Sequence, residues 1–220
     1  MHHCRVLAPL LLSVAVLPLD THAAASLLVD DASITDAGHC QLESWVRHTD
    51  AGPQWTAVPA CTLAATEWSL GLTRAPGTSH LPWTAGAKRV LIAPDQQRWA
   101  LALGAGIGDA GGGNDWNLNL PLTLGLDARQ RVQLHVNVGL AREAGIRGRT
   151  DGIGLQIAVD PRWSLLAEIA HDAAGDRGMQ VGLRRELWPG ASLDLLGGRQ
   201  QQRAGDSHWM TIGINMAALP

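Results

Sequence analysis

The chain has 220 residues, a formal net charge of −3 and 46% hydrophobic residues, with nine Trp but no Phe or Tyr. Its arginines are scattered and Lys88 is the only lysine, so no basic patch indicates a nucleic-acid-binding protein. Beyond residue 25 no apolar run reaches the length of about 18 residues that a membrane-spanning helix needs, which argues against helical membrane spans.

Residues 1–25 have the features of a secretory signal peptide. Arg5 precedes an apolar core at residues 6–19, and Ala23-x-Ala25 fits the small-residue cleavage rule. We expect this signal to be cleaved, residues 26–39 to form a short periplasmic N-terminal segment, and the folded domain to cover residues 40–220.

Alternation of apolar and polar residues dominates the rest of the chain. It is strictest at residues 115–126 (DWNLNLPLTLGL) and 131–141, which is long for a globular strand of about 5–6 residues but typical of a transmembrane β-strand of about 9–11. Strands are predicted at 40–48, 54–61, 66–74, 84–93, 99–107, 115–126, 131–141, 153–159, 163–169, 179–187, 191–195 and 210–216.

The predicted connections alternate in length. Turn formers occupy 94–96, 127–130, 160–161 and 188–190, whereas longer, Gly-rich or charged stretches occupy 108–114, 142–150, 172–177 and 202–206. Short periplasmic turns and longer external loops are typical of outer-membrane barrels. We therefore predict an antiparallel transmembrane β-barrel of about 12 strands, with a soluble β-sandwich or lipocalin-like barrel as the alternative.

Tryptophans lie beside the predicted connections, as expected of aromatic girdles at the two membrane interfaces. The predicted girdle residues are Trp83, Trp116 and Trp209 beside long loops, and Trp99, Trp163 and Trp188 beside short turns. Cys40 begins the first strand and Cys61 ends the second. An even pair in an exported chain is read as a disulfide, here a structural one across a hairpin.

The less apolar strand faces collect polar residues that we predict to line the lumen, because charges facing lipid cost about 2–4 kcal/mol at the bilayer midplane. These residues include Glu43, Glu67, Lys88, Arg98, Asn117, Asn119, His135, Asn137, Glu168, Gln180, Arg184 and Asp194. Lys88 and Glu168 are the predicted interior ion pair. The lining either forms a network that holds the barrel's shape or provides a selective solute path.

Catalytic, cofactor and metal sites are not predicted. His135 and Asn137 share a strand face, as in the Ser–His–Asn arrangement of outer-membrane phospholipase A, but that face points away from lipid and no serine has an evident place beside His135. The other histidines lack metal-ligand spacing. Gly106-x-Gly108-x-x-Gly111 has the letters of a dinucleotide-binding turn, but a period-2 strand follows it instead of a helix, so no nucleotide is expected.

The mature region resembles uncharacterised proteobacterial outer-membrane β-barrel proteins. The likeness rests on residues 28–47 (LVDDASITDAGHCQLESWVR), Val58-Pro-Ala-Cys61, Asp160-Pro-Arg-Trp163, Leu166-Ala-Glu168 and Gln180-Val-Gly-Leu-Arg184. More distantly the chain resembles the transporter family linked to the meta pathway of phenol degradation. This resemblance implies export or uptake of small solutes, aromatic compounds among them.

The leading functional prediction is a passive channel or transporter for small solutes, in contact with outer-membrane lipid. A structural barrel plugged by its own side chains is the second hypothesis. A lipid-modifying outer-membrane enzyme is the third, and it requires a lipid-accessible Ser/His pair.

Overall fold

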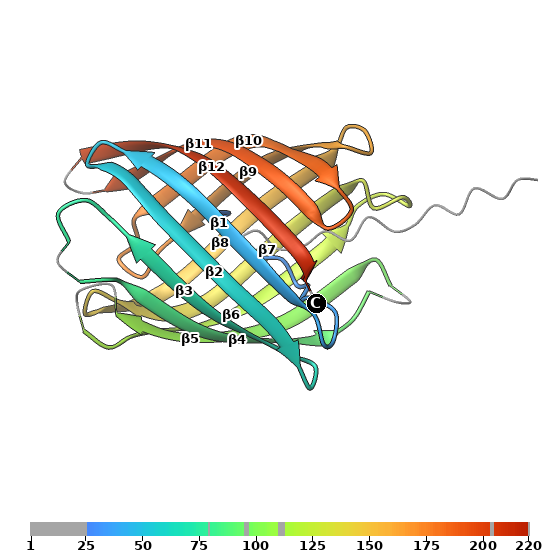
Figure 1. The fold of residues 1–220 in the computed structure, drawn as a ribbon, viewed down its shortest axis with the longest axis horizontal. Coiled ribbons are helices and arrows are strands. Elements are labelled where there is room, and N and C mark those ends of the chain that lie inside the picture. Colours follow the sequence, from blue (N-terminus) through green and yellow to red (C-terminus); the bar gives the residue numbers. More distant parts are fainter. Residues whose placement is uncertain (1–25, 79, 95–96, 110–112, 203–204, 220) are drawn as a thin grey trace, which may run out of the picture.

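The chain forms one closed sheet of twelve antiparallel strands (Figure 1). This computed structural model describes residues 26–219 apart from 79, 95–96, 110–112 and 203–204. Each strand pairs with the next, and β12 pairs with β1, so the sheet has no free edge. The predicted all-β barrel and its strand number are confirmed. The strands are β1 (Cys40–Thr49), β2 (Gly52–Leu63), β3 (Thr66–Arg74), β4 (Trp83–Ile92), β5 (Trp99–Asp109), β6 (Asp115–Gly125), β7 (Val132–Glu143), β8 (Ile146–Ala158), β9 (Trp163–His171), β10 (Arg177–Trp188), β11 (Ala191–Gln202) and β12 (Gly205–Leu219).

The outer face of the barrel is apolar. In β6, Leu118 and Leu120 are 44% and 41% exposed, whereas Pro121 on the opposite face is buried. The same alternation leaves large apolar side chains exposed around the barrel, among them Leu70, Leu103, Val138, Ile153, Leu165, Val181, Leu195 and Ile212. An apolar surface of this extent is typical of a face that contacts lipid. No helix long and apolar enough to cross a membrane occurs among the described residues.

Several connections are shorter than predicted. Glu143 of β7 pairs directly with Ile146 of β8, and Ala144 and Gly145 both have positive φ, as in a two-residue hairpin turn. The long loop predicted at 142–150 is therefore wrong. The hydrogen-bonded pairing of β7 and β8 continues beyond the part of each strand that alternates in hydrophobicity. There both faces are polar, so the sequence pattern no longer indicates a strand. For the same reason the strand predicted at 210–216 begins earlier, at Gly205.

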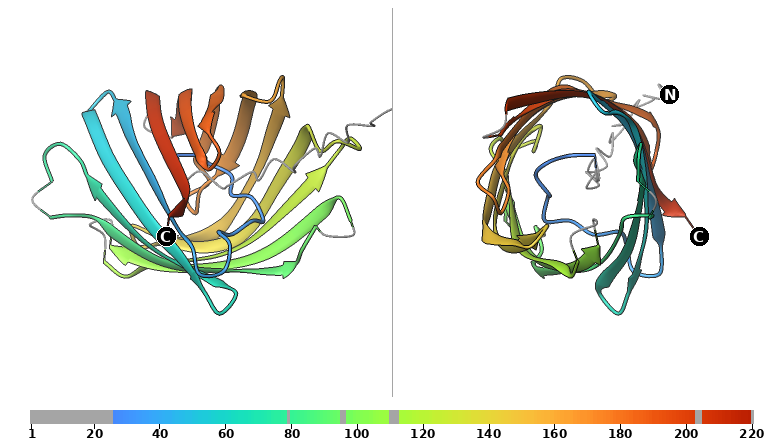
Figure 2. Two further views of the ribbon diagram at one scale, coloured as in Figure 1. Left: turned by 45° about the vertical axis from the view of Figure 1, so that its right-hand side comes forward. Right: turned by 90° about the vertical axis from the view of Figure 1, so that its left-hand side faces the viewer.

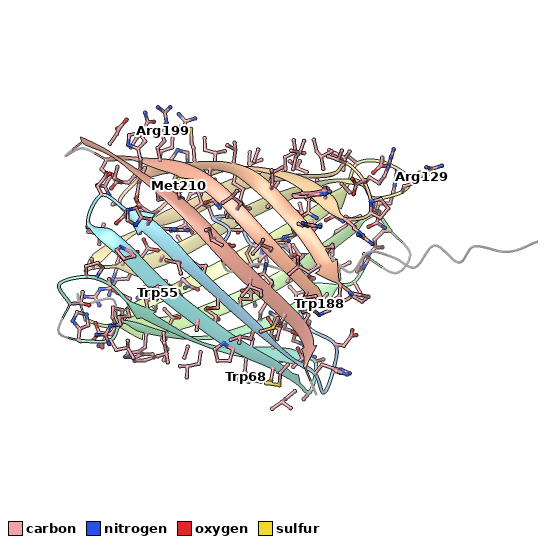
Figure 3. All side chains as sticks on the ribbon, turned by 45° about the horizontal axis from the view of Figure 1, so that its top comes forward. Trp55, Trp68, Arg129, Trp188, Arg199 and Met210 are labelled. Carbon is pink, nitrogen blue, oxygen red and sulfur yellow. A yellow bond between two sulfur atoms is a disulfide. The ribbon has the colours of Figure 1, made fainter. Side chains whose placement is uncertain are left out.

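Tryptophans lie on the outer face near both ends of the barrel. Trp83, Trp99 and Trp163 are the first residues of β4, β5 and β9, Trp116 is the second of β6, and Trp188 is the last of β10. Trp55 and Trp68 are also exposed, although the sequence analysis did not include them. Figure 3 shows Trp68 and Trp188 toward the end at which β12 finishes.

Cys40 and Cys61 form a disulfide, as predicted. They are paired residues of β1 and β2, at the end of the barrel where β1 begins and β12 ends. We call this the terminal end and the other end the open mouth. The disulfide fixes the point at which the preceding chain enters the barrel wall.

The residues before β1 run inside the barrel (Figure 2). Ser26, Val29 and Thr35 are buried, and each contacts an inward side chain of a different strand. We call residues 26–35 the inner segment. Residues 26–39 are predicted from sequence as a short periplasmic segment, and no feature of their sequence indicates that they enter the lumen.

Candidate functional site

A cavity of about 900 Å³ occupies the lumen. It opens at the mouth formed by Asp50 and Ala51 of the β1–β2 turn, the β9–β10 connection and the start of β12. Residues 27–30 line one side of it, and Gln41 and Ala60, next to the disulfide, line another. We call this cavity the vestibule.

The vestibule is acidic. Arg47 and Lys88 are the Arg and Lys side chains among its described lining residues, which also include His171 and His208. Arg47 and Lys88 are both engaged, because Arg47 lies over the Trp209 ring at 5.2 Å and Lys88 is paired with carboxylates of the inner segment. A wall with this excess of carboxylates has a negative potential. The carboxylates that line it include Asp30, Glu43, Asp50, Glu67, Glu143, Asp172 and Asp176.

Lys88 on β4 pairs with the inner segment. Its Nζ lies 2.8 Å from Asp30 Oδ1 and 3.7 Å from Asp31 Oδ1. The predicted Lys88–Glu168 pair is therefore wrong. Glu168 on β9 instead accepts hydrogen bonds from the inner segment's backbone and from Gln180 Nε2. Both residues thus contact the inner segment, which strand periodicity cannot place.

Asp31 is held ionised by its surroundings. Burial alone would raise its pKa, but Lys88 and the hydrogen bonds from Ser33 N and Oγ outweigh burial, so the pKa of Asp31 lies below its usual range. Asp31 therefore keeps its charge opposite Lys88 at neutral pH.

Arg184 and Asp194 form a buried pair at the terminal end. They are cross-strand partners on β10 and β11, joined by Nε–Oδ1 and Nη2–Oδ2 contacts of 2.7 and 2.8 Å. Asp194 is fully buried and also accepts hydrogen bonds from Ser26 Oγ and Asn215 Nδ2. This two-point pairing stabilises ionised groups that would otherwise be costly to bury.

His135 and Asn137 lie in the lumen on β7 but are not arranged as catalytic partners. His135 Nδ1 lies 3.0 Å from Thr123 Oγ1, and Asn137 bonds the backbone of Asp30 through both its amide atoms. Asn119 Nδ2 donates to Asn137 Oδ1 at 3.2 Å. These contacts belong to a structural network. Within the described residues no group of His, Cys, Asp and Glu could hold a metal ion.

Two residues from the predicted sites lie elsewhere. Arg98 is exposed in the β4–β5 connection, because β5 begins only at Trp99, so its assignment to the lumen wall is wrong. Trp209 was predicted in a girdle, but it is buried inside, donating from Nε1 to Gln180 Oε1 at 3.2 Å. It occupies an odd position of β12, opposite in face to the exposed Met210 and Ile212. The remaining predicted residues Glu43, Asn117 and Asn119 line the vestibule.

Sequence reasoning placed Glu67 and Gln180 on the lumen face but missed Arg47, and it predicted no contact partner for any of the three. Their positions follow from strand alternation once register is known, since Arg47 shares the face of Glu43, and Gln180 that of Arg184. Their partners are in the inner segment or on other strands, which no local signal reveals.

A family model described as "Uncharacterised conserved protein UCP029691" matches residues 11–218. The chain belongs to this family. No curated protein matches its sequence.

Members of another group, the solved outer-membrane porins, share the fold. A KdgM porin in complex with disordered oligogalacturonate has a TM-score of 0.67 at 10% identity, covering 80% of this chain and 98% of that chain. The NanC porin has a TM-score of 0.62 at 6% identity, with the same coverage. The Acinetobacter baumannii outer membrane protein Omp33 has a TM-score of 0.57 at 10% identity, covering 81% and 97%. At these identities the likeness concerns the fold of the barrel.

Proposed function

We propose that this protein is a passive outer-membrane channel for small solutes, with a preference for cations and neutral molecules over anions. The vestibule carries the proposal, since it is a cavity of about 900 Å³ that opens at one mouth of a barrel with an apolar outer face. Twelve strands enclose a wider interior than eight-stranded barrels, which side chains alone fill.

The charge of the vestibule supports the cation preference. Rings of Asp and Glu favour cations in pores, and the basic side chains of this wall are already engaged. The similar KdgM porin is solved with oligogalacturonate, whose sugars carry carboxylates. The acidic vestibule is a poor match for such an anionic ligand, so we do not propose oligogalacturonate as a solute of this chain.

The sequence predicts that the transported solutes include aromatic compounds. It also predicts that the signal peptide is cleaved and that the barrel then contacts outer-membrane lipid. These points stay predictions. An exported chain with an apolar barrel surface is consistent with insertion in that membrane.

Ion conductance in planar bilayers and solute uptake by liposomes test this function. We expect conductance steps, with a reversal potential in a KCl gradient that favours K⁺ over Cl⁻. Glu143→Gln should weaken this selectivity, whereas Asp206→Asn, an exposed acid on β12 near the same mouth, should not. Absence of conductance and uptake, both here and in the segment-deleted variant described below, would contradict a channel. Conductance without a preference for K⁺ would contradict the proposed cation selectivity and leave the channel function standing.

A further inference from the structure

The inner segment follows the inside of the barrel wall past most of its strands (Figure 2). Ser26 contacts Asp194 of β11, residues 28–29 contact β9, and Asp30 contacts β7 and β4. Ala32 then contacts Thr123 of β6, and Thr35 contacts Glu67 of β3. The segment thus binds to the wall along its length.

Inward side chains of the strands satisfy the segment's backbone. Leu28 N and Val29 N donate to the two carboxylate oxygens of Glu168 at 3.0 and 3.2 Å. Asn137 accepts from Asp30 N at 2.8 Å and donates to Asp30 O at 2.7 Å. The segment lies outside regular secondary structure, so the wall supplies the partners that a neighbouring strand would otherwise supply.

Glycines make room for the segment's side chains. A Cβ added at Gly152 would lie 2.9 Å from Val29 Cγ2, and one at Gly154 would lie 3.3 Å from Val29 Cβ. Added Cβ atoms at Gly178 and Gly213 would lie 3.2 Å from Leu28 Cδ1 and 3.3 Å from Ser26 Oγ. These four inward glycines of β8, β10 and β12 form a shallow track that fits this peptide.

The segment bounds one side of the vestibule. Residues 27–30 line this cavity, whereas His135, Arg184 and Asp194 are buried and do not line it. Ala32 packs against Ala100 and Ala102 in a buried apolar cluster. The segment therefore lies between the vestibule and these buried residues of β7, β10 and β11.

We propose that residues 26–35 are a built-in plug, bound reversibly in the glycine track, and that its release opens the path from the vestibule to the terminal end. The proposal rests on the channel function above and adds its regulation. The ligand of the track is a short, acidic peptide, namely this chain's own mature N-terminal region. The disulfide of Cys40 to Cys61 anchors the base of the plug, so a released segment stays tethered next to its binding site.

Deletion of residues 26–35 tests the plug directly. We expect the full-length protein to conduct in small, intermittent steps, and the deleted protein to conduct in sustained steps several-fold larger. A synthetic peptide of residues 26–36 (SLLVDDASITD) should restore the small steps, whereas a scrambled peptide should not.

A disulfide lock tests the plug without deletion, in case the deleted barrel does not fold. Cysteines introduced as Val29→Cys and Gly154→Cys would place Cβ atoms about 3.3 Å apart, close to the ~3.8 Å of natural disulfides. Oxidation should abolish opening, and reductant should restore it, with the wild type under reductant as the control.

The outcomes separate the two proposals. If neither full-length nor deleted protein conducts, the channel function is wrong. If both conduct alike, or the locked variant opens as the wild type does, the channel stands and the plug is wrong.

Discussion

Lys88 Nζ lies 2.8 Å from Asp30 Oδ1, which joins the barrel wall at β4 to the segment that crosses the lumen. The Lys88 side chain is 12% exposed and that of Asp30 is 37% exposed, so the pair is only partly shielded from solvent. A partly shielded pair can hold a segment in place and still be broken at moderate cost.

Lys88→Met should loosen the inner segment. Without the ammonium, Asp30 and Asp31 lie close together with no cation, and we expect docking to weaken by about 1–3 kcal/mol, below the cost for a fully buried pair. Limited proteolysis of the detergent-solubilised protein should then cut within residues 26–39 more quickly. Lys88→Arg keeps the positive charge, so this variant should be cut as slowly as the wild type. Equal cleavage of both variants and the wild type would refute this role of Lys88.

Gly152→Ala should displace the segment by steric overlap. The new Cβ would meet Val29 Cγ2 at 2.9 Å, and such overpacking costs about 1–3 kcal/mol. Adding Val29→Ala removes that methyl group and should restore slow proteolysis. Gly197→Ala is the matched control, because a Cβ there meets nothing within 4 Å. If the double variant is cut as fast as Gly152→Ala, the contact does not position the segment.

Asp194→Asn should destabilise the barrel itself. It leaves the buried Arg184 guanidinium without its carboxylate, which costs about 3–5 kcal/mol in comparable buried pairs. The temperature at which the protein loses its folded gel mobility should fall. Asp206→Asn, at an exposed position, should leave that temperature unchanged. An unchanged temperature for Asp194→Asn would show that the pair does not stabilise the barrel.

Trp188 and Trp209 should differ in their contact with lipid. Trp188 is 57% exposed on the outer face, whereas Trp209 is buried in the lumen. In liposomes that contain brominated lipid, Trp188→Phe should reduce the quenched fraction of fluorescence, and Trp209→Phe should leave the quenched intensity unchanged. A loss of quenching for Trp209→Phe would place that ring on the outer face and contradict the register of β12.

The sequence alone determined the barrel. Strict alternation, as at residues 115–126, can be satisfied only by a strand with one apolar and one polar face, and twelve such strands close into a sheet with an apolar exterior. The disulfide could also be predicted. Cys40 begins the first strand of one predicted hairpin and Cys61 ends the second, which places the two residues opposite each other. These features depend on residues close in the chain.

Only the tertiary structure decided what lies inside. The segment 26–35 has no strand period, and its partners Glu168, Asn137 and Lys88 lie far along the chain on three different strands. Period 2 assigns a residue to a face but not to a partner across the lumen, which is why Lys88 was paired with the wrong carboxylate. Strand register decided the side of Trp209 in the same way, since a shift by one residue exchanges lipid for lumen.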